Sequence, residues 1–225
     1  QDVEEALRLF DRAIQADPKF ATPYSARSFA LAQMFIQGNA DDLDACGTQA
    51  MADAEKALTL DDRDGFCHYA LGRACTLAGQ VDRAIPAHEK AVELQPNSAM
   101  FEYGLGFALT WFKRPLEAIP HLDAAVRLGP HDPLLWAFYN LRGNCRLFLK
   151  QFGQAITGYN LAIQFQGHQF YPHLYLAATF GYLGQRSEAK EAYDRAYQLR
   201  PDLRGVSVRD LLPHAELAEL EEGLR

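Results

Sequence analysis

Residues 71–96 read LGRACTLAGQVDRAIPAHEKAVELQP, and this stretch decides the fold because the chain copies it. Residues 105–130 read LGFALTWFKRPLEAIPHLDAAVRLGP, so that Gly72 is matched by Gly106 after an interval of 34 residues. A third copy, LAATFGYLGQRSEAKEAYDRAYQLRP, occupies residues 176–201. A fixed period of this length indicates a stack of helical units, because one such unit cannot bury its apolar face alone.

Each unit has two amphipathic segments joined by a short turn, as at residues 78–80 and 183–185. The first segment has a small residue at its middle, although glycine inside a helix costs about 1 kcal/mol relative to alanine. We therefore expect two helices to cross closely there. The second segment has an alanine, a bulky residue four positions later and then a further alanine. The small residues are Gly72, Gly106, Gly143 and Ala177 in the first segments, and Ala84, Ala91, Ala118, Ala125, Ala155, Ala162, Ala189 and Ala196 in the second.

The period, the small residues and the proline that closes most units resemble the tetratricopeptide repeat (TPR). The resemblance implies an all-α fold, a right-handed α-solenoid of stacked TPR helix pairs with a C-terminal capping helix. It predicts a TPR array over residues 1–201, then a linker and the capping helix over residues 202–225. Within the array we expect a half repeat at 1–18 and full repeats at 19–62, 63–96, 97–130, 131–167 and 168–201.

The beginning of the sequence departs from the regular pattern. Residues 2–18 match a second helix that has no first helix before it, so we expect this sequence to be part of a longer chain. The apolar face of this helix, around Leu7, Phe10 and Ile14, is then uncovered. Exposed apolar patches associate with partners, so the face predicts self-association or fraying.

The second unit is longer than the period, since 44 residues separate Pro18 from Asp62, ten more than 34. The additional residues, GNADDLDACG at 38–47, predict an acidic surface loop, because lengthening a loop costs little free energy. The second helix of this unit is then expected at residues 51–60.

The composition argues against several kinds of partner. The net charge is −7 and no basic run is present, whereas nucleic-acid binding depends on contacts from Lys and Arg to phosphate. No stretch approaches the ~20 apolar residues of a membrane span, and no signal peptide is visible. The four cysteines, Cys46, Cys67, Cys75 and Cys145, form no CxxC pair, so we expect reduced thiols in a cytoplasmic protein.

The sequence shows no motif that is typical of catalysis. It has no HExxH pair, no glycine-rich phosphate loop and no GxSxG elbow. We interpret the histidines as structural, and the carboxylates of the second helices lie among Lys and Arg, as on a solvated face. We therefore expect no enzymatic activity, no metal site and no cofactor.

The TPR resemblance implies that the first helices line the inner, concave face of the array. Aromatic side chains with a few amide and guanidinium donors gather on these helices, and such residues suit a protein or peptide ligand. The alternative, that several of them fill the core between units, stays open. The predicted row consists of Phe66, Tyr69, Arg73, Tyr103, Phe107, Thr110, Trp111, Asn140, Asn144, Tyr171 and Tyr182.

Some TPR domains bind a C-terminal carboxylate through Lys and Asn at fixed positions on the concave face. Here the corresponding positions are occupied by Tyr69, Arg73, Tyr103 and Phe107. The resemblance therefore does not imply that this chain binds chaperone tails.

Several sequence segments are similar to those of one bacterial architecture. This is the TPR region that follows the catalytic domain of class III adenylate cyclases or the winged-helix domain of transcription regulators. They are ALRLFDRAIQADPKFATPYSARSFA at 6–30, RLGPHDPLLW at 127–136 and LEEGLR at 220–225. The metal-binding aspartates and purine-recognition residues of a cyclase have no counterpart in this sequence. We expect a scaffold that binds a protein or peptide or, as the alternative, the regulatory segment of a cyclase or DNA-binding regulator.

Overall fold

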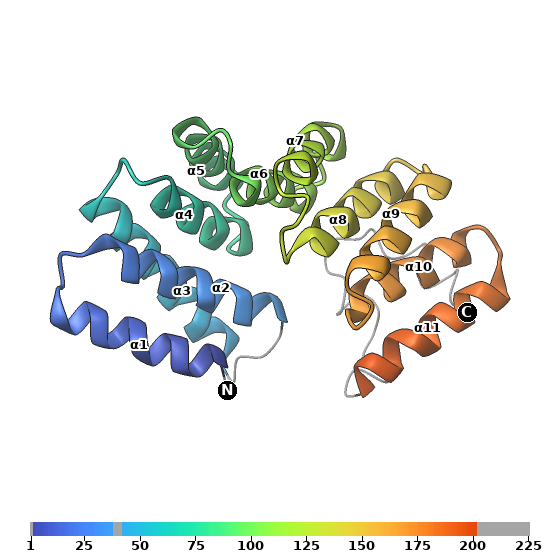
Figure 1. Cartoon of the computed structure of the whole chain (residues 1–225), viewed down its shortest axis with the longest axis horizontal. Helices are drawn as coiled ribbons and strands as arrows, with labels where there is room; N and C mark the ends of the chain where they lie inside the picture. Colours follow the sequence, from blue (N-terminus) through green and yellow to red (C-terminus); the bar gives the residue numbers. More distant parts are fainter. Residues whose placement is uncertain (1, 38–41, 202–225) are drawn as a thin grey trace. The chain divides into compact units, whose positions relative to one another are not determined.

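The computed structural model describes residues 2–37 and 42–201 of the chain (Figure 1). Within those ranges every regular element is an α-helix, and the fold is an all-α helical-repeat solenoid. The capping helix predicted within residues 202–225 lies outside the described residues. The helices are α1 (Asp2–Ala16), α2 (Ala21–Gln37), α3 (Leu43–Leu60), α4 (Gly65–Leu77), α5 (Val81–Leu94), α6 (Ala99–Trp111), α7 (Pro115–Leu128), α8 (Leu135–Phe148), α9 (Phe152–Phe165), α10 (Phe170–Tyr182) and α11 (Arg186–Leu199).

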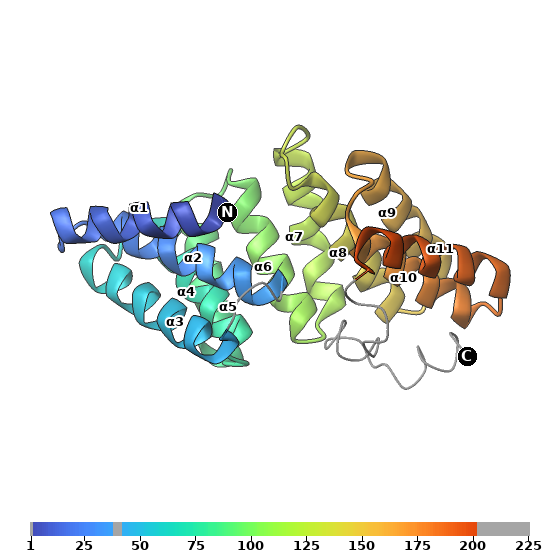
Figure 2. The same ribbon diagram turned by 90° about the horizontal axis from the view of Figure 1, so that it is seen from below.

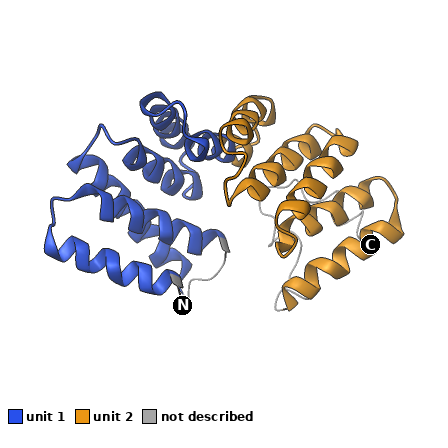
Figure 3. Cartoon of the chain, viewed as in Figure 1, with its two compact units in different colours: residues 1–108 blue, residues 109–225 orange. Residues whose placement is uncertain are grey.

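The chain divides into two compact units, residues 1–108 and residues 109–225, which Figure 3 shows in different colours. The boundary lies inside α6, so this helix contributes most of its length to unit 1 and its last residues to unit 2. Each unit has its own buried apolar clusters. The boundaries of the individual repeats stay a prediction.

In unit 1 the helices pack as successive pairs. α2 packs against α3 and α4 against α5, while α4 also contacts both helices of the preceding pair (Figures 1 and 2). α1 packs against α2, and its apolar residues Leu7, Phe10 and Ile14 are only half-buried. Self-association through this face stays a prediction.

In unit 2 the same pairing recurs. α8 packs against α9 and α10 against α11, while α10 also contacts α9 and α8, and α7 contacts α8. The rings of Tyr159 on α9 and Tyr175 on α10 stack with centroids 5.6 Å apart and planes within 9°. This stack lies in the largest apolar cluster described for unit 2, together with Ala155 and Ala177.

The alanines of the second helices are buried in both units, as the repeat pattern predicts. Between the two alanines of a helix lies one bulky side chain, and His88, Leu122 and Tyr159 at these positions are fully buried. A small residue at either side lets the neighbouring helix approach, and the large side chain between them fills the remaining space. The alanines without exposed surface are Ala84, Ala91, Ala118, Ala125, Ala155 and Ala162.

Two glycines of the first helices confirm the predicted close crossings. A β-carbon on residue 72 would stand 2.6 Å from Cδ2 of His88, closer than real β-carbon contacts come. A β-carbon on residue 143 would collide in the same way with the ring of Tyr159. In both cases the aromatic ring of the following second helix lies against bare backbone.

In four of the repeats the turn between the two helices contains one residue with left-handed backbone geometry. This residue is Gly79 between α4 and α5 and Gly184 between α10 and α11, both at φ 71°. Lys113 and Lys150 occupy the same place in the two intervening turns, at φ 57°. Left-handed geometry costs a residue with a β-carbon roughly 1–2 kcal/mol, so these two lysines adopt it at a cost that glycine avoids.

The expected acidic loop of the second unit is wrong over residues 43–47, which are helical. α3 begins at Leu43 rather than near residue 51, because Asp42 caps the helix by accepting a hydrogen bond from the backbone N–H of Ala45 at 2.9 Å. Compared with α4 and α5, α2 has 17 residues instead of 13 and α3 has 18 instead of 14. Eight of the ten additional residues therefore lengthen the two helices.

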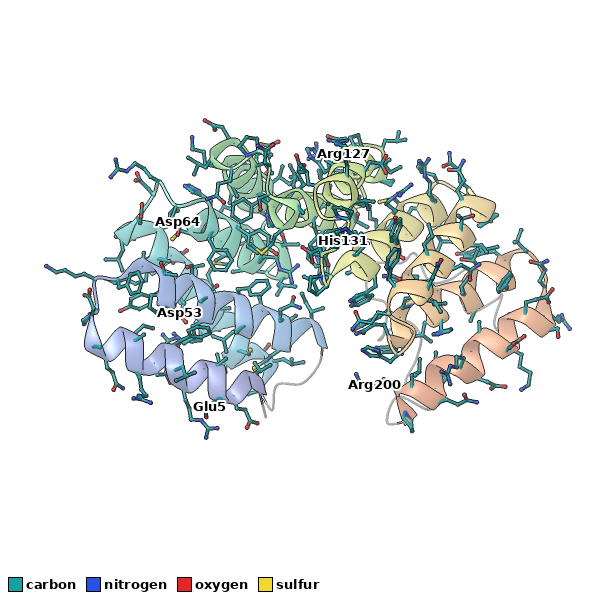
Figure 4. The ribbon with its side chains drawn as sticks, viewed as in Figure 1. Glu5, Asp53, Asp64, Arg127, His131 and Arg200 are labelled. Atoms are coloured by element: carbon teal, nitrogen blue, oxygen red, sulfur yellow. The ribbon has the colours of Figure 1, made fainter. Side chains whose placement is uncertain are left out.

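A buried ion pair joins α2 to α3 in unit 1. The Nε and Nη2 atoms of Arg27 donate to the two carboxylate oxygens of Asp53 at 2.7 and 2.6 Å, and Asp53 is labelled in Figure 4. Gln49 also donates to Asp53, at 3.0 Å, while Arg27 has a second ion pair with Asp11 on α1. A carboxylate that is 3% exposed is thus satisfied by three donors.

Candidate functional site

The predicted row divides between the two units, and the row as a whole stays a prediction. Unit 1 contains Phe66, Tyr69, Arg73, Tyr103 and Phe107, while the other members belong to unit 2. Six of the eleven side chains are buried and five are partly exposed. The buried ones are Tyr69, Arg73, Phe107, Thr110, Asn140 and Asn144, and the partly exposed ones are Phe66, Tyr103, Trp111, Tyr171 and Tyr182.

The five residues of unit 1 form a single cluster around Arg73. The Phe66 and Tyr69 rings of α4 stack with centroids 5.9 Å apart, and Tyr69 stacks on Phe101 of α6 at 5.4 Å. Tyr103 and Phe107 of α6 have their ring centroids 6.4 Å apart. Tyr69 is 1% exposed and also meets the ring of His88 edge-on, so it belongs to the core of the unit.

Two further residues, Phe29 and Gln33, complete this cluster and were not predicted from the sequence. Phe29 lies 6.1 Å from Phe66 and 5.8 Å from Tyr69, measured between ring centroids. It is the ninth residue of α2, as Arg73 is the ninth of α4 and Phe107 the ninth of α6. The signal was in the sequence, because Phe29 lies 44 residues before Arg73, the lengthened period of the second unit.

The guanidinium of Arg73 lies between the side chains that occupy its own position in the neighbouring first helices. Its Cζ is 4.5 Å from the ring centroid of Phe107 and 5.8 Å from that of Phe29. Cations are attracted to aromatic faces at such distances. The residue is 1% exposed, which is unusual for an arginine.

The hydrogen bonding of Arg73 is incomplete. Nη2 donates to the side-chain oxygen of Gln33, whereas Nε and Nη1 have no hydrogen-bond partner in the part of the chain that the structure describes. The positive charge of Arg73 affects the pKa values of two neighbouring side chains. Burial raises the pKa of Tyr103, and the charge of Arg73 opposes that rise. Burial and the charge of Arg73 together lower the pKa of His88 to about 3.

The polar members of the row in unit 2 lie on α6 and α8. Thr110 and Cys145 are in hydrogen-bond contact, with Oγ1 and Sγ 3.2 Å apart, and the Tyr159 hydroxyl donates to Oδ1 of Asn144 at 3.0 Å. The Oδ1 atom of Asn140 is buried, and none of the described residues gives it a hydrogen bond. Thr110 and Asn144 therefore take part in the core of unit 2, while the amide of Asn140 retains an open acceptor.

The aromatic members of the row in unit 2 are partly exposed. Tyr182 of α10 stacks on Phe152 of α9, with centroids 5.6 Å apart, and Tyr171 lies 4.0 Å from Phe170. Burial raises the pKa of Tyr171, and the charge of Arg200 opposes the rise. These rings combine contact with the core and exposure to solvent.

The described residues offer little for metal or thiol chemistry. Within residues 2–37 and 42–201, no group of three His, Cys, Asp or Glu side chains is placed to hold a metal ion. All four cysteines are buried and free, and burial raises the pKa of Cys145 to about 11, so this thiol stays protonated at neutral pH. Over the same ranges no helix is both long enough and apolar enough to cross a membrane.

Two models of one repeat family match the sequence where these helix pairs lie. The tetratricopeptide repeat is matched at residues 67–100, which include α5 and most of α4, and at residues 176–203, which include α11. The chain contains tetratricopeptide repeats. The matches agree with the 34-residue period and with the helix pairs of both units.

Solved structures resemble this TPR protein at low sequence identity. A chain of the APC/C hetero-tetramer Cut9–Hcn1 covers 96% of it with a TM-score of 0.77 and 18% identity, and the TPR protein spans 40% of that chain. PilW, a type IV pilus biogenesis factor, covers 88% with a TM-score of 0.67 and 22% identity, over 90% of its own chain. YrrB, a TPR protein with an unusual peptide-binding site, covers 86% with a TM-score of 0.55 and 23% identity, over 93% of its own chain. At these identities the likeness concerns the fold.

No curated protein matches the sequence. The narrower resemblance to the TPR regions of adenylate cyclases and winged-helix regulators finds no support in these comparisons.

Proposed function

We propose that this TPR protein is a protein-interaction scaffold that holds a peptide segment of its partner on the first helices of its repeats. The observation that carries the proposal is the cluster in unit 1. There the partly exposed rings of Phe29, Phe66 and Tyr103 belong to one cluster with an arginine whose hydrogen bonding is incomplete. Aromatic and arginine side chains contribute most of the binding energy at protein interfaces.

The packing behind these rings favours binding over a purely structural role. Phe29 and Phe66 contact Tyr69, which is itself buried against Phe101 and His88. The exposed rings are therefore held from behind and lose little conformational freedom when a ligand covers them. Preorganised side chains of this kind lower the entropic cost of association.

Asn140 supports the same proposal in unit 2. A buried amide oxygen without a partner costs roughly 1–3 kcal/mol, and a backbone N–H of a bound peptide would satisfy it. The fold is also used in this way elsewhere, because YrrB is described as a TPR protein with a peptide-binding site.

The experiment is a selection of random peptides displayed on phage, carried out with the TPR protein as bait. We expect enriched peptides that bind in solution, and binding that weakens at least about 10-fold in the Phe66→Ala variant, which corresponds to 1.4 kcal/mol. Val81→Ala is the matched control in unit 1, because Val81 is exposed on the second helix α5. Circular dichroism checks that both variants remain folded.

Two results would contradict the proposal. One is the absence of any enriched peptide. The other is a set of enriched peptides whose affinity changes equally in the Phe66→Ala and Val81→Ala variants, because the first helices would then have no special part in binding.

A further inference from the structure

We propose that Arg73 is the anion-binding position of this TPR protein and receives the side-chain carboxylate of an Asp or Glu within the partner segment. The inference rests on the proposed function and names the chemistry that the partner must bring. It is carried by a buried cation whose donors are only partly used, at the centre of the aromatic cluster of unit 1.

The charge of Arg73 cannot be removed by deprotonation, because a guanidinium stays protonated in proteins. An isolated buried charge is costly unless it is paired and hydrogen-bonded. Among the described residues no carboxylate forms an ion pair with Arg73, and its hydrogen-bond partners, the amide of Gln33 and the hydroxyl of Tyr103, are neutral. The unliganded protein thus holds a cation that lacks a counter-ion from the described part of the chain.

The aromatic rings do not satisfy the hydrogen-bond donors of the guanidinium, and these donors are buried. Phe107 and Phe29 lie against the group and attract its charge, but their faces cannot accept a strong N–H hydrogen bond. The open donors, Nε and Nη1, are on the edge of the planar group. A carboxylate oxygen is the acceptor that gives such donors their strongest hydrogen bonds.

The charge balance favours a carboxylate over a phosphate. Arg73 is the cation whose charge lowers the pKa of His88 and opposes the rise in the pKa of Tyr103. One positive charge matches the single negative charge of a carboxylate. A phosphate dianion would leave an uncompensated negative charge in a buried place.

The positions of the rings favour a side-chain carboxylate over a chain terminus. Partly exposed rings lie on either side of Arg73 in the order of the first helices, Phe29 on α2 and Tyr103 on α6. A segment that covers both rings continues past Arg73 in both directions, so the residue above Arg73 is internal to the segment.

Entry of the carboxylate requires one side chain to move. Gln33 is half-buried and lies near the C-terminal end of α2, and its amide can rotate away as the carboxylate takes its place. The exchange replaces a neutral acceptor by an ionised one, and hydrogen bonds to ionised partners are about twice as strong. Gln33 therefore acts as the resting partner of Arg73.

The first test asks whether Arg73 is needed for folding. Arg73→Met keeps the length of the side chain and removes the charge. Because replacing a buried charge by an apolar group is often neutral or stabilising, we expect an equal or higher Tm. A lower Tm of Arg73→Met would overturn the inference, since the arginine would then serve the core.

The second test uses the peptides selected by the wild-type protein, displayed once with internal random residues and once with a free C-terminus. We expect internal display to enrich a fixed Asp or Glu, and its replacement by Gln or Asn to weaken binding at least 10-fold. The same replacement should change the affinity for the Arg73→Met protein less than 2-fold, because that protein lacks the positive charge with which the carboxylate pairs. Arg73→Lys, which retains the charge, should recover part of the affinity at low salt.

The outcomes separate this inference from the proposed function. Two results would overturn the role of Arg73 while the scaffold function stands. One is a set of enriched peptides without an acidic consensus. The other is an acidic residue whose replacement weakens binding equally for the wild-type and the Arg73→Met protein. Enrichment that requires the free C-terminus would overturn the side-chain assignment. If no peptide is enriched in either format, both proposals fail.

Discussion

The imidazole ring of His88 lies directly on the backbone of Gly72, 2.6 Å from the place that a β-carbon on residue 72 would occupy. Both residues are fully enclosed, and Gly104 of α6 lies on the same ring, with its own β-carbon position 3.0 Å from Cε1 of His88. One histidine thus fills the space where three helices of unit 1 meet.

We expect Gly72→Ala to destabilise the protein, because the methyl group would force His88 out of its position. Overpacking of this kind costs about 1–3 kcal/mol, while alanine recovers roughly 1 kcal/mol of helix propensity. Urea denaturation measures the net loss. Gly153→Ala is the control, since nothing lies within 4 Å of its β-carbon position and the change should be neutral or stabilising. Equal effects of both changes would refute the close crossing.

His88 also makes stability depend on pH. Burial and the charge of Arg73 lower its pKa from 6.5 to about 3 in the folded protein. As the pH falls below 6.5, the unfolded chain binds a proton that the folded protein does not, so the free energy of unfolding decreases. The contribution is complete above pH 6.5 and is lost toward pH 3, by at most about 1.4 kcal/mol per pH unit.

The check is a comparison with His88→Leu, because Leu122 occupies the equivalent position of α7. The variant should lose less stability between pH 6.5 and 4 than the wild type does. Equal losses in chemical denaturation over this interval would show that His88 does not contribute to acid sensitivity.

The helix pairs could be predicted from sequence because their signal is local and repeated. Ala84, Ala91 and their equivalents are small for one physical reason in every copy, and all of them are buried. The added helical turns of α2 and α3 were hidden by a Gly–Asn–Ala–Asp sequence that is typical of loops. The cap at Asp42 was readable, but nothing local shows that a helix will continue for 18 residues.

The cluster around Arg73 could be predicted only in part. Periodicity places Arg73 and Phe107 at one position of successive repeats, but the ten inserted residues displace Phe29 from the 34-residue register. A first helix packs against its own second helix and against the neighbouring repeat, so aromatic residues occur on its buried faces as well as on its exposed face. Their pattern in the sequence therefore cannot distinguish core residues from exposed ones. Tyr69 and Phe107 are therefore buried, whereas Phe66 and Tyr103 remain partly exposed.

Replacement of Lys150 by glycine should stabilise the protein. Its φ of 57° costs a residue with a β-carbon roughly 1–2 kcal/mol, although glycine adds entropy to the unfolded chain. We expect Lys150→Gly to raise the free energy of unfolding by up to about 1 kcal/mol. The converse change, Gly184→Ala at φ 71°, should lower it, and a decrease in both variants would contradict the strain argument.

The pair of Arg27 and Asp53 should contribute more than an exposed ion pair. Asp53→Asn leaves part of the half-buried Arg27 guanidinium unsatisfied, and we expect a loss on the order of 1–3 kcal/mol in urea denaturation. Glu5→Gln disrupts the exposed pair with Arg8 and should change stability by less than about 0.5 kcal/mol. The Arg27→Met, Asp53→Leu double variant should be more stable than Asp53→Asn, because no charge is then left buried.

Trp111 tests whether the predicted row extends into unit 2. Its side chain is partly exposed at the end of α6, and truncation of a binding tryptophan costs about 2 kcal/mol or more. If Trp111 contacts the ligand, Trp111→Ala should weaken binding of a selected peptide roughly 30-fold and leave the helicity unchanged. Leu116→Ala is the control in unit 2, because Leu116 is 71% exposed on α7. Loss of helicity in Trp111→Ala would assign the ring to the core, and unchanged affinity would confine the binding surface to unit 1.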